Sequence, residues 1–256
     1  MMDISLTLIG LLVGFLVGLT GVGGAALLTP FLIMMGIQPT IAVGTDLVYN
    51  SITKIFGTLQ HWRQKTIDWT IVLYFGIGSV PSAILAVHFL HWIQTQFGSA
   101  DTVVKKVLGF ALILIPIVML IKTIQSRKEV RPNKWQQKST HEKRLLVITS
   151  GAILGFIVGL TSVGSGSLFA LVLLYFFQMR GSLTVGTDIA HAFFLVTAAG
   201  FTHILYGSVN YATVLQLLTG SIPGVFIGSL LTLKVPTIHL RYLICGIILI
   251  SGLKMI

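Results

Sequence analysis

Long apolar stretches separated by short polar interruptions run through the whole chain. Those at 69–90, 104–121 and 183–206 have close to the roughly 20 residues that a helix needs to cross the hydrocarbon core of a bilayer. Their apolar positions are continuous rather than alternating. They therefore predict helices, and not the strands of about ten residues that build an outer-membrane barrel. The pattern predicts an all-α integral membrane protein.

Two pairs of shorter apolar runs flank glycine-rich breaks. They cover 4–19 and 25–35 in the first half, and 145–160 and 167–178 in the second. A run of 11 to 16 residues extends roughly 17 to 24 Å, which is less than the ~30 Å of hydrocarbon. Each pair is expected to form either a re-entrant broken hairpin, with its tip inside the membrane, or two short tilted spans. The chain would then have about eight to ten spans.

The two halves share the same order of segments and part of the same sequence. The ten residues that begin at Gly14 return at Gly155 with eight identities, an offset of 141 (155 − 14). The Val-Gly-Thr-Asp of 43–46 returns at 185–188. Chance would match roughly one position in ten in such a composition, so the halves are duplicates. We expect a first transmembrane repeat at 1–123, a linker at 124–143 and a second repeat at 144–256.

The number of crossings sets the relation between these repeats. A hairpin that returns to its starting side adds none or two crossings, and three further runs in each half make the total odd. The second repeat must then enter the membrane from the opposite side. We therefore expect two inverted repeats of about five segments each, as in many secondary transporters.

Charge predicts the orientation of the bundle. The formal net charge is +10, and eight of the 17 Lys and Arg residues lie between Lys122 and Arg144. A basic loop between spans is typical of the cytoplasmic side of an inner (plasma) membrane, and its position argues against nucleic acid as a partner. The linker is therefore expected in the cytoplasm and both termini outside. Lys105 and Lys106 are exceptions, because they would fall on the outer side.

Composition agrees with a membrane location. Hydrophobic residues make up 54% of the chain, charged residues 9%, and the mean hydropathy is +0.93. Residues 1–19 have Asp3 where a secretory signal begins with basic residues, so we expect them to belong to the mature fold. The single Cys245 has no disulfide partner, and no metal or cofactor is expected. His61 and His203, each close to an aromatic residue, are expected as anchors at the membrane interface.

The glycine-rich breaks are the first candidate for a binding site. A broken helix leaves backbone groups unpaired, which costs several kcal/mol per group in hydrocarbon unless protein, water or a ligand satisfies them. Backbone N–H groups at a helix start favour an anion, and glycine lets it approach. The alternative is close packing of helices through small residues. The candidates are Thr20, Gly21, Val22, Gly23 and Gly24 in the first half, and Thr161, Ser162, Val163, Gly164, Ser165 and Gly166 in the second.

Charged residues inside apolar runs are the second candidate. Asp46 and Asp188 occupy equivalent positions, and an intramembrane carboxylate by default faces the interior and serves a function. Spacing of four places Asn50 and Lys54 on the same helical stripe as Asp46. The second repeat adds His191 but has no counterpart of Lys54. These five residues are candidates for proton coupling or an ion pathway. Alternatively, the aspartates are structural and bind backbone groups at the breaks.

At these residues the chain resembles a known family. The pattern G-x-x-x-G-L-T-G-V-G-G followed by A-V-G-T-D, repeated as G-x-x-x-G-L-T-S-V-G-S-G followed by T-V-G-T-D, is similar to the TauE/SafE family, often called sulfite exporters or permeases. The likeness covers both halves and leaves out only the linker. It implies a multi-pass inner-membrane carrier of small sulfur-containing anions. Ser162 and Ser165 depart from the all-glycine form of the motif.

The sequence thus predicts a secondary transporter and not an enzyme. Its expected substrate is a small sulfur-containing anion (sulfite, thiosulfate, sulfate or an organosulfonate), bound near the membrane midplane at the paired breaks and coupled to protons. The other expected partner is membrane lipid. An anion channel of the same architecture, and a membrane enzyme or assembly factor without transport activity, remain alternatives. The choice of anion, the direction of transport and the oligomeric state stay open.

Overall fold

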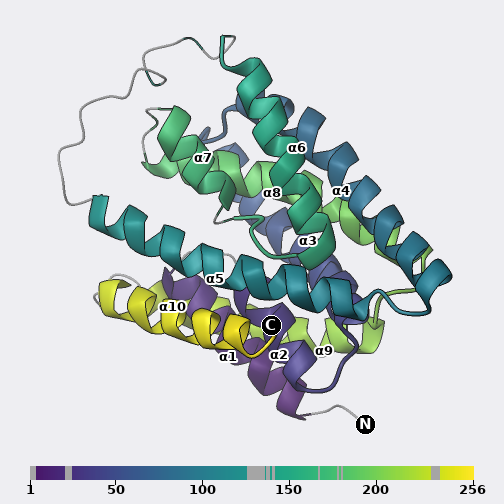
Figure 1. Cartoon of the computed structure of the whole chain (residues 1–256). Helices are drawn as coiled ribbons and strands as arrows, with labels where there is room; N and C mark the ends of the chain where they lie inside the picture. Colours follow the sequence, from purple (N-terminus) through teal and green to yellow (C-terminus); the bar gives the residue numbers. More distant parts are fainter. Residues whose placement is uncertain are drawn as a thin grey trace.

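The computed structural model describes residues 4–20, 25–125, 136, 139, 142–166, 168–177, 179, 181–231 and 237–256. Most of the expected linker lies outside these residues. All regular structure in the described residues is α-helical (Figure 1). The helices are α1 (Ile4–Thr20), α2 (Ala25–Met34), α3 (Pro39–Arg63), α4 (Trp69–Phe97), α5 (Asp101–Gln125), α6 (Arg144–Thr161), α7 (Leu168–Phe176), α8 (Gly181–Leu205), α9 (Tyr211–Leu231) and α10 (Thr237–Leu253).

Helix lengths and the outer surface confirm an all-α membrane protein. Among the described residues, four helices have the length and apolar composition to cross a bilayer: Trp69–Phe97, Arg144–Thr161, Ser182–Leu205 and Tyr211–Gly228. Large apolar side chains cover the outside of the bundle, with Phe110 and Phe226 64% and 68% exposed. Contiguous apolar surface of this kind is rare on soluble monomers but suits contact with lipid.

The central pair of helices consists of equivalent elements from the two halves. Gly44 near the start of α3 lies against His203 near the end of α8, and Gly186 near the start of α8 lies against His61 near the end of α3. The two helices therefore run antiparallel. The equivalent helices α5 and α10 also lie side by side (Figure 1). Antiparallel packing of equivalent elements is the arrangement that an inverted repeat produces.

Two further pairs interlock the halves, because α1 packs on α9 and α4 packs on α6. Glycines make these contacts close. A Cβ added at Gly155 would lie 2.4 Å from the Ser79 carbonyl oxygen, and one added at Gly14 would lie 2.4 Å from that of Ser221. Such backbone approach is typical of small-residue helix contacts in membranes. The glycines that open each repeated motif thus pack helices, whereas Gly164 lies in the second break.

The Gly-Thr of each Val-Gly-Thr-Asp motif holds a loop of the opposite half. A Cβ added at Gly44 would lie 2.1 Å from the carbonyl oxygen of Ser208, which follows α8. Next to it, the Thr45 hydroxyl accepts a hydrogen bond from the backbone N–H of Asn210 at 3.0 Å. The same contacts recur between Gly186 and Thr66 and, at 2.9 Å, between Thr187 and Asp68.

These two loops also start the next helices. The Asn210 side chain accepts from the backbone N–H of Thr213, and the Asp68 side chain accepts from those of Thr70 and Ile71. Both residues therefore cap a helix start, at α9 and α4 respectively. Each motif thus helps to fix where a helix of the other half begins. The sequence did not reveal this role, because the two residues that form each hydrogen bond lie 119 or 165 positions apart.

Gly155→Ala is expected to lower the free energy of unfolding by about 1–3 kcal/mol, because the added methyl group would overlap the backbone of α4. Gly76→Ala on α4 is the control, since an added Cβ there meets nothing within 4 Å. It should be neutral or stabilising by up to about 1 kcal/mol. Unfolding in mixed detergent micelles, followed by circular dichroism, measures both. Equal losses in the two variants would contradict the close α4–α6 contact.

Candidate functional site

The break between α6 and α7 turns the chain back inside the molecule. Ser162 and Gly164 have positive φ angles of 62° and 101°, and Ser162 and Ser165 are buried. The backbone N–H of Ser162 donates to the Val158 carbonyl at 2.7 Å, which closes the end of α6. The nine residues of α7 extend only roughly 14 Å, so this helix by itself cannot cross a bilayer.

Backbone donors remain available in this break. The Thr161 hydroxyl donates to the Ile157 carbonyl at 2.7 Å and accepts from the backbone N–H of Val163 at 3.2 Å, so it stabilises the break itself. Among the described residues, the amides of Gly164, Ser165 and Gly166 have no acceptor at hydrogen-bonding geometry. They precede the start of α7, where the helix dipole favours a negative charge.

Of the first break, Gly21, Val22, Gly23 and Gly24 lie outside the described residues, and Thr20 is described only as the last residue of α1. The helices on either side of it contact the second break. Residues of α1 and α2, including Leu16 and Leu28, share one hydrophobic core cluster with Val163 of the second break. The described break therefore packs against the first half.

Asp46 is fully buried, and hydrogen bonds hold its carboxylate from two sides. The Thr29 hydroxyl on α2 donates to Oδ2 at 2.6 Å. The side-chain amide of Asn50 donates to Oδ1, also at 2.6 Å. Ser162 of the second break lies close enough to interact with this carboxylate, although its hydroxyl has no hydrogen bond of normal geometry in the described part of the chain. Asp46 thus joins α2, α3 and the second break.

Asp188 occupies the equivalent position in different surroundings. It is buried, but Ala192 stands where the first half has Asn50. Lys54, which is half-buried on α3, interacts electrostatically with both Asp188 and Asp46. The structure therefore brings together one lysine and the two aspartates that the sequence predicted, one from each half.

His191 lies beside this group, where it also interacts electrostatically with Lys54. It is buried, and its Nε2 lies 2.7 Å from the Ser79 hydroxyl on α4. Its ring centroid is 4.3 Å from that of Phe169 and 5.3 Å from that of Phe75. Tyr49 holds the equivalent position in the first half. A histidine packed in this way can position its hydrogen-bond partner or carry a proton.

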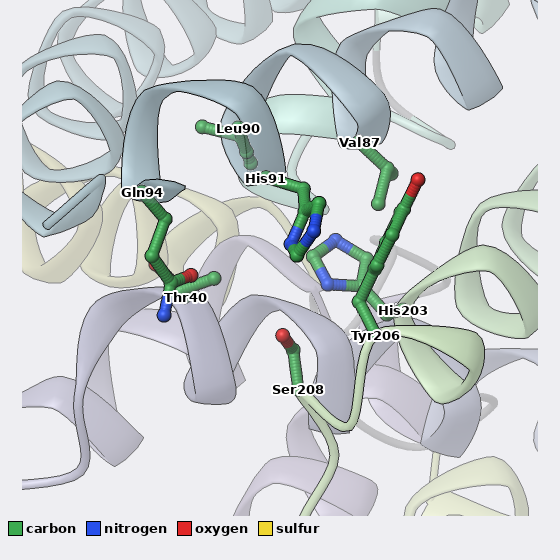
Figure 2. Close-up of a pocket in the computed structure, with 8 residues that line it drawn as sticks. All are labelled: Thr40, Val87, Leu90, His91, Gln94, His203, Tyr206 and Ser208. Carbon is green, nitrogen blue, oxygen red and sulfur yellow. The ribbon is translucent and has the colours of Figure 1, made fainter. Parts of the chain in front are cut away.

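The prediction that His203 is an anchor at the membrane interface is wrong. Only 1% of its surface is exposed, so the side chain is buried inside the bundle. It lies beside a narrow pocket at the end of the bundle where α3 begins (Figure 2). Residues of α3, α4 and α8, with the loop after α8, form this pocket together, so the sequence alone did not reveal it. Its lining residues are Thr40, Val87, Leu90, His91, Gln94, His203, Tyr206 and Ser208.

An all-helical membrane bundle with interlocked, antiparallel halves and charged residues buried between them defines a membrane transport protein. Comparison with known proteins agrees. The chain belongs to the family described as "Sulfite exporter TauE/SafE", whose family model matches residues 6–255. No solved structure matches the chain.

Relatives with the same general description cover nearly the whole chain. A probable membrane transporter protein of Bacillus subtilis, YjnA, is 54% identical over 255 residues, which span 100% of both chains. A second from that organism, YunE, is 24% identical and covers 99% of this chain and 97% of its own. One from Methanocaldococcus jannaschii is 27% identical, with 98% and 94% covered. The protein is a membrane transporter of this family.

Thr29→Val is expected to lower the free energy of unfolding by about 1–3 kcal/mol, because it leaves one oxygen of the buried Asp46 carboxylate without its donor. Thr29→Ser should retain most of the stability. Ser51→Ala is the control, since the Ser51 hydroxyl bonds only the Val48 carbonyl of its own helix. The same micellar unfolding measurement applies. A Thr29→Val variant as stable as Ser51→Ala would show that this bond contributes nothing.

Proposed function

We propose that this protein is a secondary transporter of small sulfur-containing anions, of the class of sulfite, thiosulfate, sulfate and organosulfonates. One observation carries the proposal: Lys54 interacts electrostatically with the two buried aspartates, and the break that contacts Asp46 has amides, those of Gly164, Ser165 and Gly166, without an acceptor among the described residues. The family description, sulfite exporter, supports the choice of anion. The anion site near the midplane is part of the proposal.

Backbone N–H groups would supply most of the contacts to the anion. The amides of Gly164, Ser165 and Gly166 precede α7, and glycine leaves room for an oxyanion at the backbone. In the first half, Gly21 to Gly24 would do the same before α2. Lys54 would compensate the negative charge of the substrate, since an unpaired charge is costly inside the membrane.

We assign proton coupling to Asp188 with His191, and a structural role to Asp46. The Asp46 carboxylate already accepts hydrogen bonds from Thr29 and Asn50, which hold it in its present position. Asp188 interacts electrostatically with Lys54 and lies three residues before His191 on α8, a residue type suited to proton transfer. Protonation of Asp188 would release Lys54 to the substrate, and binding and proton uptake would then favour each other.

The proposed orientation follows from the distribution of charge. With the basic linker in the cytoplasm of a cell with an inner (plasma) membrane, the end of the bundle at which α3 begins faces outward. The central helices α3 and α8 would then have opposite directions across the membrane, and alternating access would expose the site to each side in turn.

Uptake into proteoliposomes tests the function. Purified protein is expected to transport at least one of sulfite, thiosulfate, sulfate and methanesulfonate with saturable kinetics. Lys54→Met should lower kcat/KM by about tenfold or more, equivalent to 1.4 kcal/mol of lost binding in the transport cycle, while Lys54→Arg keeps the charge and most of the activity. Unitary currents in planar bilayers would indicate a channel instead. No flux of any of the four anions, by protein that remains folded, would favour an enzyme or assembly factor.

The coupling assignment has its own test. Asp188→Asn is expected to abolish the dependence of uptake on an imposed pH gradient, because the amide cannot take up the proton. Asp46→Asn should reduce stability but keep that dependence. The measurement compares initial rates with and without the gradient at one substrate concentration. If Asp188→Asn retained the wild-type dependence, Asp188 would have no part in coupling.

A further inference from the structure

Each of the two central helices, α3 and α8, carries a histidine near its end and is followed by a loop with a hydroxyl residue. Only one of these two histidines has a hydrogen-bond partner of normal geometry among the described residues. At one end, Nδ1 of His61 lies 2.8 Å from the Thr66 hydroxyl. At the other end, His203 and Ser208 occupy the equivalent positions. Neither ring nitrogen of His203 has a hydrogen-bond partner of normal geometry among the described residues. A buried polar group without a partner is costly, so a ligand is a natural complement.

The pocket beside His203 offers further donors. Figure 2 shows the rings of His203 and His91 next to each other, with Ser208 and Gln94 at the sides. Imidazole, hydroxyl and amide groups can all donate hydrogen bonds to an oxyanion. The lining residues include no carboxylate. The neighbouring Asp101 accepts instead from the backbone N–H and hydroxyl of Thr40, at 3.1 and 2.8 Å. In the sequence of the second half, Leu233 and Pro236 stand at the positions equivalent to His91 and Gln94.

Two lysines provide positive charge at the same end of the bundle. Lys105 and Lys106 are exposed on α5, one helical turn after Asp101, whose carboxylate binds the pocket residue Thr40. Like Lys254 near the C-terminus, they do not fit the predicted distribution of charge across the membrane. Positive charge at the mouth of a site raises the local concentration of anions and their association rate. Their position on the outer side is explained if anions enter the protein at this end of the bundle.

The pocket also leads toward the interior site. The His203 side chain lies against Gly44, two residues before Asp46. The backbone of Gly159 on α6 is close enough to influence the ring, and the second break begins three residues later at Ser162. His203 therefore separates the pocket from the two elements that hold the candidate anion site.

From these contacts we propose that the His203 pocket is a second anion site, at which the transported oxyanion is first bound by His203 and Ser208 before it moves to the break. This rests on the proposed function, because it assigns the entrance of the same pathway. At present the pocket is narrow, about the size of one water molecule. The His91 ring, stacked on Tyr206 with centroids 3.9 Å apart, is one of its lining side chains, and we expect it to turn away when the anion binds.

Sided transport measurements test this. With sulfite as the probe, His203→Ala should raise KM by about tenfold or more for uptake from the pocket side, since a hydrogen bond to a charged ligand is lost. It should change KM from the opposite side by less than about twofold. His203→Gln, which keeps a donor, should recover most of the affinity. His88→Ala is the matched control, because this exposed histidine lies one turn before His91 and does not line the pocket.

A blocking experiment keeps the proposal testable even if His203→Ala does not fold. Gln94→Cys, in a Cys245→Ala background, should lose transport after labelling with a bulky membrane-impermeant thiol reagent. His88→Cys labelled in the same way should keep it. Unchanged transport in labelled Gln94→Cys, or equal KM changes from both sides in His203→Ala, would overturn the proposed entrance site. If the wild-type protein transports no sulfite or related anion, the function itself fails, which is a separate outcome.

Discussion

Polar groups inside the membrane must find their partners within the protein, and the interior of this bundle follows from that constraint. Two carboxylates and a broken backbone are buried in the bundle beside a half-buried lysine, where few of their polar groups can reach water. Thr29 and Asn50 donate hydrogen bonds to Asp46, the Thr161 hydroxyl accepts from the Val163 backbone N–H in the second break, and Lys54 interacts with both aspartates. Because these partners come from different helices, the polar centre also fixes how the halves meet.

The backbone contacts of the two halves are equivalent, whereas the polar side chains at the centre of the bundle differ between the halves. Backbone contacts repeat closely: Gly14 and Gly155 meet equivalent serine carbonyls, and Thr45 and Thr187 hold equivalent loops. Side chains at the centre differ, since only one half has the lysine. A site built from two equal halves would have no preferred direction. Unequal halves can bind substrate and proton differently on the two sides of the membrane.

The sequence analysis predicted the all-α membrane class and the family correctly, because apolar runs and a ten-residue repeat are local patterns. It also singled out Asp46, Asp188 and Lys54, which the structure brings together. It missed the docking role of the Gly-Thr pair and the burial of His203, since both depend on loops and helices of the other half. The roles assigned to the glycine-rich breaks in transport stay predictions.

Sequence by itself determined that the chain lies in a membrane, that it is duplicated, and which polar residues must be buried, because the cost of polar groups in hydrocarbon depends on residue type. Tertiary structure decided which partners each of two equivalent residues meets. Asp46 and Asp188 stand in identical motifs, and His61 and His203 stand at equivalent positions. One hydrogen bond of Asp46 nevertheless comes from Thr29, which lies 17 residues away on another helix. Only packing brings such partners to hydrogen-bonding distance.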